Sequence, residues 1–327
     1  MTILLTGGTG FLGGRVALRL LQAGHEVRVL VRPGPRRGGL PEGARPVAGD
    51  VTDLEALTAA AGGCEAIVHA AALVKVWVPD PSAFDRINVG GLRNVLEAAR
   101  RTGVRRVVHT SSFIALGPTD GRVADETQVH PGGARNDYER TKAEADRVGR
   151  QAAEAGAPLV TVYPGVIYGA GRWTEGSLMT RTIRDFMRGK VPGYLGDGRG
   201  RVCLAFMDDV IEGHLLALER GRPGRGYILG GANASWRELY AVLARLTGAP
   251  EPTRRIPFWA LSLAGRVLRW RAELTGAEPV LTDRVVAVYR HDWAYSSGRA
   301  EAELGYRVTP LEEGLRRTVE WLRAEAA

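Results

Sequence analysis

The sequence predicts an α/β protein, in which a Rossmann-type, doubly wound parallel sheet carries a smaller, mostly helical C-terminal substrate lobe. Three observations lead to this fold class. An apolar N-terminal run stops at three glycines with the spacing Gly7-x-x-Gly10-x-x-Gly13. Short β-rich runs then alternate with helical stretches as far as about Val166, which is typical of a parallel sheet. After Gly165 this alternation is lost, and the C-terminal part of the chain becomes mainly helical.

The N-terminal segment predicts a buried strand at 2–5, a tight turn and a helix at 14–23. Gly7 lets the chain turn, Gly10 lets the backbone approach a pyrophosphate, and Gly13 lets helix and strand pack closely. The unsatisfied N–H groups at the start of the helix would then hold the phosphates. The alternative is an ordinary glycine-rich turn. An apolar strand followed at once by a helix favours a dinucleotide site.

The remaining elements follow from hydrophobic periodicity and turn residues. Further strands are expected at 26–31, 45–48, 66–69, 106–110, 159–163 and 226–230. Further helices are expected at 53–60, 82–101, 137–155, 177–188, 206–222 and 235–246. Right-handed crossovers between the strands would build one sheet.

The order of these elements predicts two lobes. Residues 1–168 would form the dinucleotide-binding Rossmann domain, to which residues 203–232 would return. Residues 169–202, a loop-rich insertion with one helix, and 233–327 would form the substrate-binding lobe. The apolar stretch 256–270 contains two arginines and is too short to span a bilayer. We expect a partly buried helix there, and a helix lying at a membrane surface is the alternative.

Composition indicates a cytoplasmic globular protein. The chain has 327 residues and a net charge of +8, which raises the question of nucleic-acid binding. The basic residues are almost all scattered arginines, often beside acids, so no nucleic-acid partner is expected. The basic balance would still attract anionic cofactors or substrates. Cys64 and Cys203 lack metal-binding spacing and are expected to be free thiols, and the N-terminus does not resemble a signal peptide.

Catalytic residues are expected at the ends of two elements. The strand at 106–110 runs into Ser111 and Ser112, at the edge where a doubly wound sheet binds its ligand. Tyr138 and Lys142 share one face of the next helix. A lysine ammonium one turn away is expected to lower the pKa of the tyrosine, which makes it a better acid-base group.

The roles follow from this placement. Tyr138 would be the acid-base residue, and Lys142 would also bond the nicotinamide ribose. Ser112, nearer the strand exit, would hold the substrate oxygen, while Ser111 would position the cofactor. The alternative is an exposed Tyr/Lys pair without function, but only three lysines occur in the chain and one stands four residues after a tyrosine.

The second strand ends in Arg32, without an acidic residue that would bond the ribose 2′-hydroxyl of NAD. An arginine suits a 2′-phosphate through its charge and forked donors. NADP(H) is therefore expected in preference to NAD(H). If Arg32 only stacks on the adenine, either cofactor would fit.

Together these motifs resemble the extended short-chain dehydrogenase/reductase family, also called the NAD-dependent epimerase/dehydratase superfamily. The resemblance rests on 6–13, Gly49-Asp50-Val51-Thr52-Asp53, His69-Ala70-Ala71-Ala72, Thr110-Ser111-Ser112, Tyr138-x-x-x-Lys142 and 206–214, in that order. It implies that Asp50 and Val51 touch the adenine, that Ala70 to Ala72 line the ribose and nicotinamide side, and that Pro164-Gly165-Val166 flank the nicotinamide ring. His69 is expected to be a packed core residue. The full cofactor set so expected is Gly7, Thr9, Gly10, Phe11, Leu12, Gly13, Arg32, Asp50, Val51, Ala70, Ala71, Ala72, Thr110, Ser111, Tyr138, Lys142, Tyr163, Pro164, Gly165 and Val166.

Within that family the chain resembles the dihydroflavonol reductase and 3β-hydroxysteroid dehydrogenase branch, and it is similar to bacterial hopanoid-associated sugar epimerase-like proteins. Dehydratases carry an acid after the active-site threonine, where this chain has Ser111 and Ser112. Epimerases carry an asparagine where this chain has Val166. The resemblance therefore implies a reductase or dehydrogenase acting on a ketone, an aldehyde or a secondary alcohol. A nucleotide-sugar epimerase with tightly bound NAD and a non-catalytic NADPH sensor are the alternatives. The resemblance also implies a homodimer.

The residues that line the substrate pocket are the feature that the sequence determines least. Candidate lining residues are Lys75, Trp77, Phe113, Trp173 and Tyr194, which would suit a moderately apolar substrate. The other possibility is an anionic substrate group bound by Arg172, Arg199 or Arg201. No metal site is expected.

Overall fold

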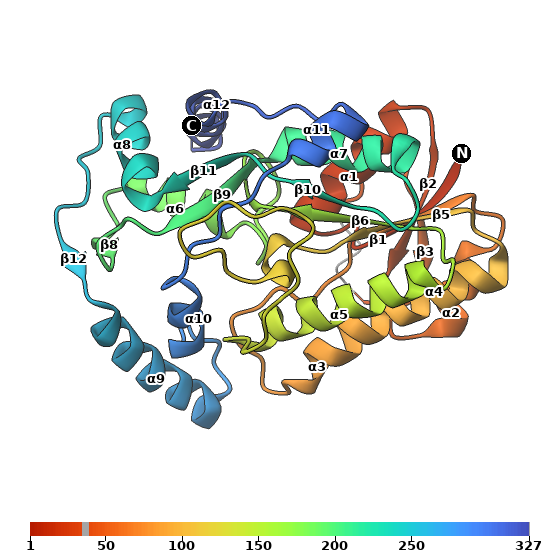
Figure 1. The fold of residues 1–327 in the computed structure, drawn as a ribbon, viewed down its shortest axis with the longest axis horizontal. Coiled ribbons are helices and arrows are strands. Elements are labelled where there is room, and N and C mark those ends of the chain that lie inside the picture. Colours follow the sequence, from red (N-terminus) through yellow and green to blue (C-terminus); the bar gives the residue numbers. More distant parts are fainter. Residues whose placement is uncertain (35–38, 327) are drawn as a thin grey trace.

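Seven parallel strands form the central sheet, in the order β10-β6-β5-β4-β1-β2-β3 (Figure 1). The computed structural model describes residues 1–34 and 39–326. The strands are β1 (Thr2–Thr6), β2 (Glu26–Val31), β3 (Arg45–Ala48), β4 (Ala66–His69), β5 (Arg106–Thr110), β6 (Leu159–Pro164) and β10 (Gly226–Leu229). All seven predicted strands are confirmed within one residue of their expected bounds. The order reverses between β1 and β4, and in such sheets the ligand crevice lies at this point.

Helices cover both faces of this sheet, as a doubly wound fold requires. On one face lie α1 (Phe11–Gln22), α7 (Met207–Arg220) and α11 (Gly298–Leu304), whose apolar residues join those of β1, β2 and β10 in one core. On the other face lie α2 (Leu54–Ala61), α4 (Gly91–Thr102) and α5 (Asp137–Glu154). Since neither sheet face is open to solvent, substrate access is confined to the strand ends.

The helix expected at 82–101 is interrupted by a π-helical turn. It consists of α3 (Ser82–Phe84), the π-helical segment η1 (Asp85–Gly90) and α4. Widened turns of this kind often mark functional positions, because they turn one side chain out of the regular helical face. Here the turn carries Asn88, which is buried.

The smaller lobe contains more strand than expected. Three strands, β7 (Val166–Tyr168), β9 (Arg201–Phe206) and β11 (Ala232–Ser235), make a second sheet. Two more, β8 (Tyr194–Leu195) and β12 (Arg255–Ile256), pair in parallel. The expectation of a loop-rich insertion with one helix is therefore wrong from Arg201 onward, where β9 begins. This strand is buried along nearly all its length, so it lacks the alternation that identifies a half-exposed strand.

The other elements of this lobe are α6 (Leu178–Met187), α8 (Trp236–Thr247), α9 (Phe258–Thr275), α10 (Asp283–Val288) and α12 (Leu311–Ala324), while the short 3-10 helix η2 (Phe113–Leu116) follows β5 of the central sheet. The expected helix near 256–270 is thus confirmed as α9. It is more exposed than expected, because Gly265 and Ala272 are its buried residues. No described helix has the length and apolar content needed to cross a membrane. The exact division between the two lobes stays a prediction.

Candidate active site

The glycine loop between β1 and α1 has the geometry that its spacing predicts. Gly7 has a φ of +76°, which L side chains rarely adopt. A Cβ on Gly13 would lie 2.2 Å from the Gly7 carbonyl oxygen, so only glycine lets α1 start this close to the strand. The Gly10 amide donates to the same carbonyl across 3.0 Å. A backbone hydrogen bond therefore closes the turn.

This loop fits a dinucleotide pyrophosphate. Helix α1 has Gly10 as its N-cap, with no side-chain cap and no acidic residue in its first turn. Its first N–H groups and positive dipole end are thus available to an anion. A Cβ on Gly10 would meet the Gly7 carbonyl oxygen and no other atom within 4 Å. The space beside Gly10 would let a pyrophosphate come close to the backbone. Nearby in the fold, the buried Ser111 hydroxyl has no hydrogen-bond partner within the described chain.

The expected cofactor segments meet at the same edge of the sheet. A Cβ on Gly7 would lie 2.6 Å from the Ala71 nitrogen, which brings the 70–72 segment against the glycine loop. The Thr6 hydroxyl accepts a hydrogen bond from that Ala71 amide at 3.2 Å and bonds His69 Nδ1 at 2.8 Å. His69 is buried, and desolvation lowers its pKa to about 3, consistent with a core residue. Thr6 was not predicted as a site residue, yet it fixes this edge.

The adenine side of the expected site is built from loop residues. Asp50 accepts bonds from the backbone and side chain of Thr52, which shapes the turn after β3. Val51 is buried under α4. Arg32 is exposed directly after β2, next to residues 35–38, which lie outside the described residues. Its expected bond to a 2′-phosphate stays a prediction.

Ser112, Tyr138 and Lys142 converge from β5 and α5. Ser112 is buried at the start of η2, and its hydroxyl is hydrogen-bonded to Tyr138. The Lys142 ammonium donates to the Thr110 carbonyl at 3.2 Å and lies 5.9 Å from the centre of the Tyr138 ring. The three expected catalytic side chains therefore form one group at the end of β5.

The expected effect of Lys142 on the tyrosine is not found. Desolvation raises the pKa of Tyr138 to about 12, although the bond from Ser112 partly offsets the rise. Desolvation also lowers the pKa of Lys142 to about 8. The expectation of a lowered tyrosine pKa is wrong for this structure, because the apolar surroundings outweigh the nearby ammonium, which faces the Thr110 carbonyl.

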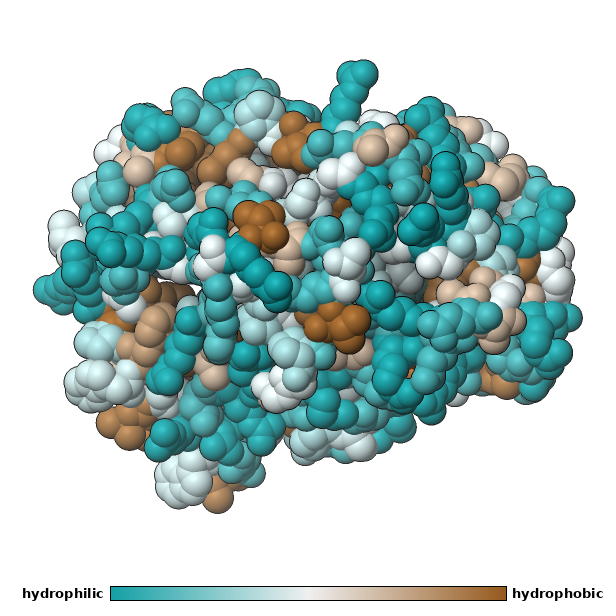
Figure 2. Space-filling model, in the orientation of Figure 1, coloured by the Kyte–Doolittle hydropathy of each residue, from teal (hydrophilic) through white to brown (hydrophobic). Residues whose placement is uncertain are grey.

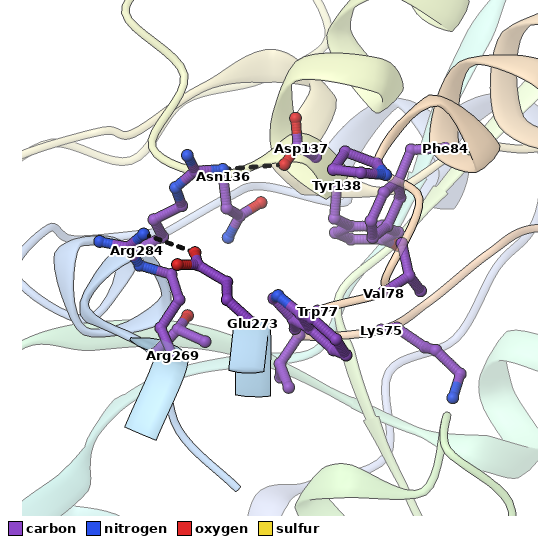
Figure 3. Close-up of a pocket in the computed structure, with 13 residues that line it drawn as sticks. Lys75, Trp77, Val78, Phe84, Asn136, Asp137, Tyr138, Arg269, Glu273 and Arg284 are labelled. Carbon is purple, nitrogen blue, oxygen red and sulfur yellow. Dashed lines mark hydrogen bonds and ion pairs between the residues drawn. The ribbon is translucent and has the colours of Figure 1, made fainter. Parts of the chain in front are cut away.

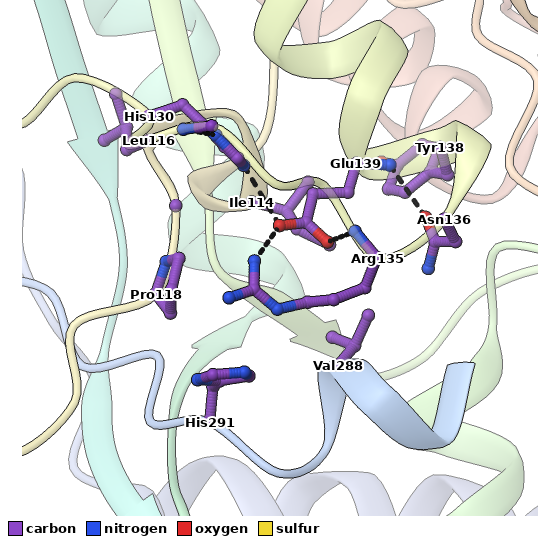
Figure 4. A network of polar contacts seen from close by, with 12 residues as sticks. Ile114, Leu116, Pro118, His130, Arg135, Asn136, Tyr138, Glu139, Val288 and His291 are labelled. Atoms are coloured by element: carbon purple, nitrogen blue, oxygen red, sulfur yellow. Dashed lines mark hydrogen bonds and ion pairs between the residues drawn. The ribbon is translucent and has the colours of Figure 1, made fainter. Parts of the chain in front are cut away.

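A buried ionic network sits directly beside Tyr138 (Figure 4). The Glu139 carboxylate accepts bonds from His130 Nε2 at 3.0 Å, the Arg135 amide at 2.9 Å and the Arg135 guanidinium at 2.6 Å. Burial alone would raise the pKa of Glu139, but these bonds hold it below its ordinary value. Asn136 caps the same helix through the Glu139 amide. The network therefore fixes where α5 begins and so where Tyr138 lies.

Asn88, in the π-helical turn, joins the pocket wall to α5. Its side chain accepts from the Leu73 amide at 2.7 Å and donates to Thr141 Oγ1 at 3.0 Å, next to Lys142. Neither Asn88 nor Glu139 was predicted. The available signal was a polar residue between the apolar Ile87 and Val89 for Asn88, and an acid next to the tyrosine for Glu139.

Tyr138 opens onto a pocket between the two lobes (Figure 3). Its apolar lining comes from Val76, Trp77, Val78, Pro81 and Phe84. Its basic lining residues are each ion-paired within the described chain. Lys75 bonds Glu175 and Glu278, Arg269 bonds Glu273 and Asp283, and Arg284 bonds Asp137.

A model of the NAD dependent epimerase/dehydratase family matches residues 3–230. The chain belongs to this family. The expected resemblance is confirmed. A protein of Synechocystis sp. that carries the name dihydroflavonol 4-reductase is 34% identical over 98% of this chain and 94% of its own length. The 4-hydroxy-2-methyl-3-oxo-4-farnesyl-3,4-dihydroquinoline-1-oxide ketoreductase of Stigmatella aurantiaca is 32% identical over 94% of this chain and 93% of its own.

Solved structures with the same fold superpose on nearly the whole chain. The crystal structure of gox2253 superposes with a TM-score of 0.83 at 34% identity, covering 99% of this chain and 98% of that one. The UDP-glucose 4-epimerase of Thermus thermophilus, in complex with NAD, superposes with a TM-score of 0.75 at 25% identity and 99% coverage of both chains. The same fold is thus found in an epimerase-named structure, which contains NAD, while the Synechocystis and Stigmatella relatives carry reductase names.

Of the five expected substrate residues, the structure places Lys75 and Trp77 in the pocket and the others elsewhere. Phe113 is buried against Trp293. Trp173 packs on Trp321 near the C-terminus. Tyr194 belongs to the core of the smaller lobe, with its hydroxyl on Glu251. Each of these three aromatic side chains fills a packing site, so we leave them out of the pocket.

The structure also shows where the other expected binding side chains lie. The Tyr163 side chain is buried and bonds Asp146 at 2.5 Å, on the core side of β6, so it does not face the sheet edge where the cofactor is expected. Arg172 lies against Gly39 and borders a hollow with Gly10 and Arg15, at the start of α1. The expected anion binders Arg199 and Arg201 pair with Asp197 and Asp292, away from the pocket.

Proposed function

We propose that the protein is an NADP(H)-dependent oxidoreductase that transfers a hydride between nicotinamide and a ketone, an aldehyde or a secondary alcohol. The observation that carries this proposal is the pocket beside Tyr138. One wall of it is apolar, and its described basic residues are already neutralised by carboxylates. The diphosphate of a nucleotide sugar would need free cations and would have to break such pairs, whereas a neutral carbonyl compound would not.

Each residue of the site would have one role in carbonyl reduction. When bound, the cofactor supplies a hydride for the carbonyl carbon. Ser112 would donate a hydrogen bond to the substrate oxygen, and Tyr138 would give that oxygen its proton. The high pKa of Tyr138 suits this direction, because the phenol stays protonated at neutral pH. Lys142 would hold the cofactor ribose beside the phenol.

Several finer points belong to the proposal. Exposed Arg32 would bind the 2′-phosphate of NADP(H), and the expected cofactor residues from the glycine loop to Val166, apart from Tyr163, would hold the rest. The smaller lobe, from 169–202 and 233–327, would supply the substrate pocket. A cytoplasmic homodimer is the expected form. The ketoreductase name of the Stigmatella relative supports a carbonyl substrate.

The decisive experiment is a panel of ketones, aldehydes and UDP-sugars, assayed with NADPH and NADH in parallel. Substrate-dependent oxidation of NADPH supports the proposal. Protein that is purified with bound NAD and inverts C4 of a UDP-sugar without net redox change would identify an epimerase instead. Cofactor binding without any turnover across the panel would favour the sensor alternative.

A further inference from the structure

Helix α9 exposes a continuous apolar stripe. Five of its exposed large side chains follow one another at steps of four, four, three and four residues, which places them on one helix face. They are Trp259, Leu263, Val267, Trp270 and Leu274, with exposed fractions from 56% to 70%. In Figure 2, pale and brown groups follow the lower left edge of the molecule, where Figure 1 places α9. Exposed apolar surface of this kind usually marks a binding face.

The outward orientation of this stripe is fixed by packing. The inward face of α9 carries Gly265 and Ala272, which lie on one helix face. A Cβ on Gly265 would lie 2.4 Å from the Asp283 nitrogen, so α9 packs directly against the start of α10. Arg269 anchors the same side through Asp283 at 2.8 Å. The helix cannot rotate to bury the stripe without losing these contacts.

The unpaired charges around the stripe are positive, and the neighbouring Glu273 is paired with Arg269. Arg266 and Arg271 are exposed on α9, and Arg254 and Arg255 are exposed just before it. None of the four forms an ion pair within residues 1–34 and 39–326. By helical spacing, Arg266 and Arg271 border the stripe on its two sides. Tryptophan and arginine at the edges of an apolar face are typical of helices that lie in a membrane interface.

We propose that α9 docks this protein on the surface of an anionic lipid bilayer, with the stripe among the acyl chains and the four arginines among the headgroups. The charges favour lipid over a second copy of the chain. In a two-fold interface the patch would meet itself and would bring unpaired arginines together. Arg269 and Glu273 of α9 also line the pocket, so the docked helix would set the pocket mouth beside the bilayer. That last point rests on the proposed function, but the docking does not.

Sedimentation with vesicles tests the proposal. The full chain is mixed with vesicles of phosphatidylcholine alone or of equimolar phosphatidylcholine and phosphatidylglycerol. We expect wild type to sediment with the anionic vesicles and Val267→Glu to bind them at least about tenfold less, because a buried carboxylate is costly in lipid. Arg266→Glu combined with Arg271→Glu should lose the preference for phosphatidylglycerol. Val123→Glu is the matched control, since Val123 is 52% exposed and Val267 56%.

Three results would overturn the proposal. One is wild type that stays in the supernatant with anionic vesicles. Another is Val267→Glu that sediments as well as wild type does. The third is a dimer that light scattering shows to become a monomer in Val267→Glu without any lipid binding, which would assign the stripe to a second copy. Thermal unfolding of each variant reports its folding, and reduction of a water-soluble ketone tests the proposed function separately.

Discussion

The Lys142 ammonium donates a hydrogen bond to the Thr110 carbonyl oxygen across 3.2 Å. This bond joins α5 to the end of β5, from which the chain runs directly into Ser112. Tyr138 stands one helical turn before Lys142, so the same bond holds its phenol against the Ser112 hydroxyl. The lysine thus acts on the tyrosine through position in this structure, more than through charge.

Replacing Tyr138 with phenylalanine removes the proposed proton donor and little volume. We expect kcat for carbonyl reduction to fall by about 100-fold or more. NADPH binding, followed by its fluorescence, should be retained. Tyr194→Phe is the matched control, because the Tyr194 hydroxyl bonds Glu251 outside the pocket. Equal turnover by wild type and Tyr138→Phe would remove Tyr138 from the mechanism.

Replacing Arg32 with serine tests the cofactor preference. If the guanidinium binds a 2′-phosphate, the KM for NADPH should rise by about tenfold or more, because a charge-assisted bond is lost. The KM for NADH should hardly change. Parallel kinetics with the two cofactors measure the difference. An equal loss for both cofactors would indicate that Arg32 only stacks on the adenine.

Replacing Gly10 with alanine should separate cofactor binding from folding. Gly10 has a φ of −85°, which alanine adopts, so we expect the free energy of unfolding to stay within about 1 kcal/mol of wild type. The new methyl group would occupy the space meant for the pyrophosphate, so dinucleotide affinity should fall steeply. Gly90→Ala is the control, since its Cβ would meet its nearest atom at 3.6 Å. Unchanged NADPH affinity in Gly10→Ala would place the pyrophosphate elsewhere.

The fold was largely predictable from the sequence because its strands are local apolar runs. Most strands of the central sheet show such a run, with β3 as the exposed exception, and turn residues mark the strand ends. β9 escaped this reasoning although it too is a buried apolar run, because a short apolar run outside the alternating strand-helix pattern cannot be told from a buried helix segment by periodicity. The π-helical turn at Asp85–Gly90 also escaped, because such turns are rare and have no sequence pattern that separates them from an ordinary helical turn.

The site was predictable where chemistry imposes a spacing. The three glycines and the Tyr138/Lys142 pair carry such a constraint. Glu139 and Asn88 do not, because their roles depend on partners that only the fold brings near. The expected aromatic residues Trp173 and Tyr194 show the converse case, in which a chemically suitable residue serves packing.

The pKa of Lys142 predicts a pH effect on stability. Its value of about 8, against an ordinary 10.5, means that the unfolded chain holds a proton that the native state releases. Between these values the unfolded state binds more protons, so stability rises with pH. We expect the free energy of unfolding of wild type to increase relative to Lys142→Met from pH 7 to 10, as measured by urea titration. A difference that is constant or shrinks over this range would contradict the prediction.

The Glu139 network predicts a loss of stability at low pH. The pKa of Glu139 is held below its ordinary 4.5, so the carboxylate contributes stability that is present above that value and is lost as pH falls through the folded value. Glu139→Gln keeps the shape but leaves His130 and Arg135 without a charged acceptor. At pH 7 it should lower the free energy of unfolding by about 1–3 kcal/mol, and the loss should shrink below about pH 4.5.

Urea titrations over this range measure the effect, with Glu154→Gln as control, because Glu154 is exposed at the end of the same helix. Since the network sets where α5 begins, kcat should fall in Glu139→Gln at a pH where the variant remains folded. A variant that loses stability and keeps full kcat would show that the network supports the fold without positioning Tyr138. One that is as stable as wild type at pH 7 would contradict the electrostatic argument itself.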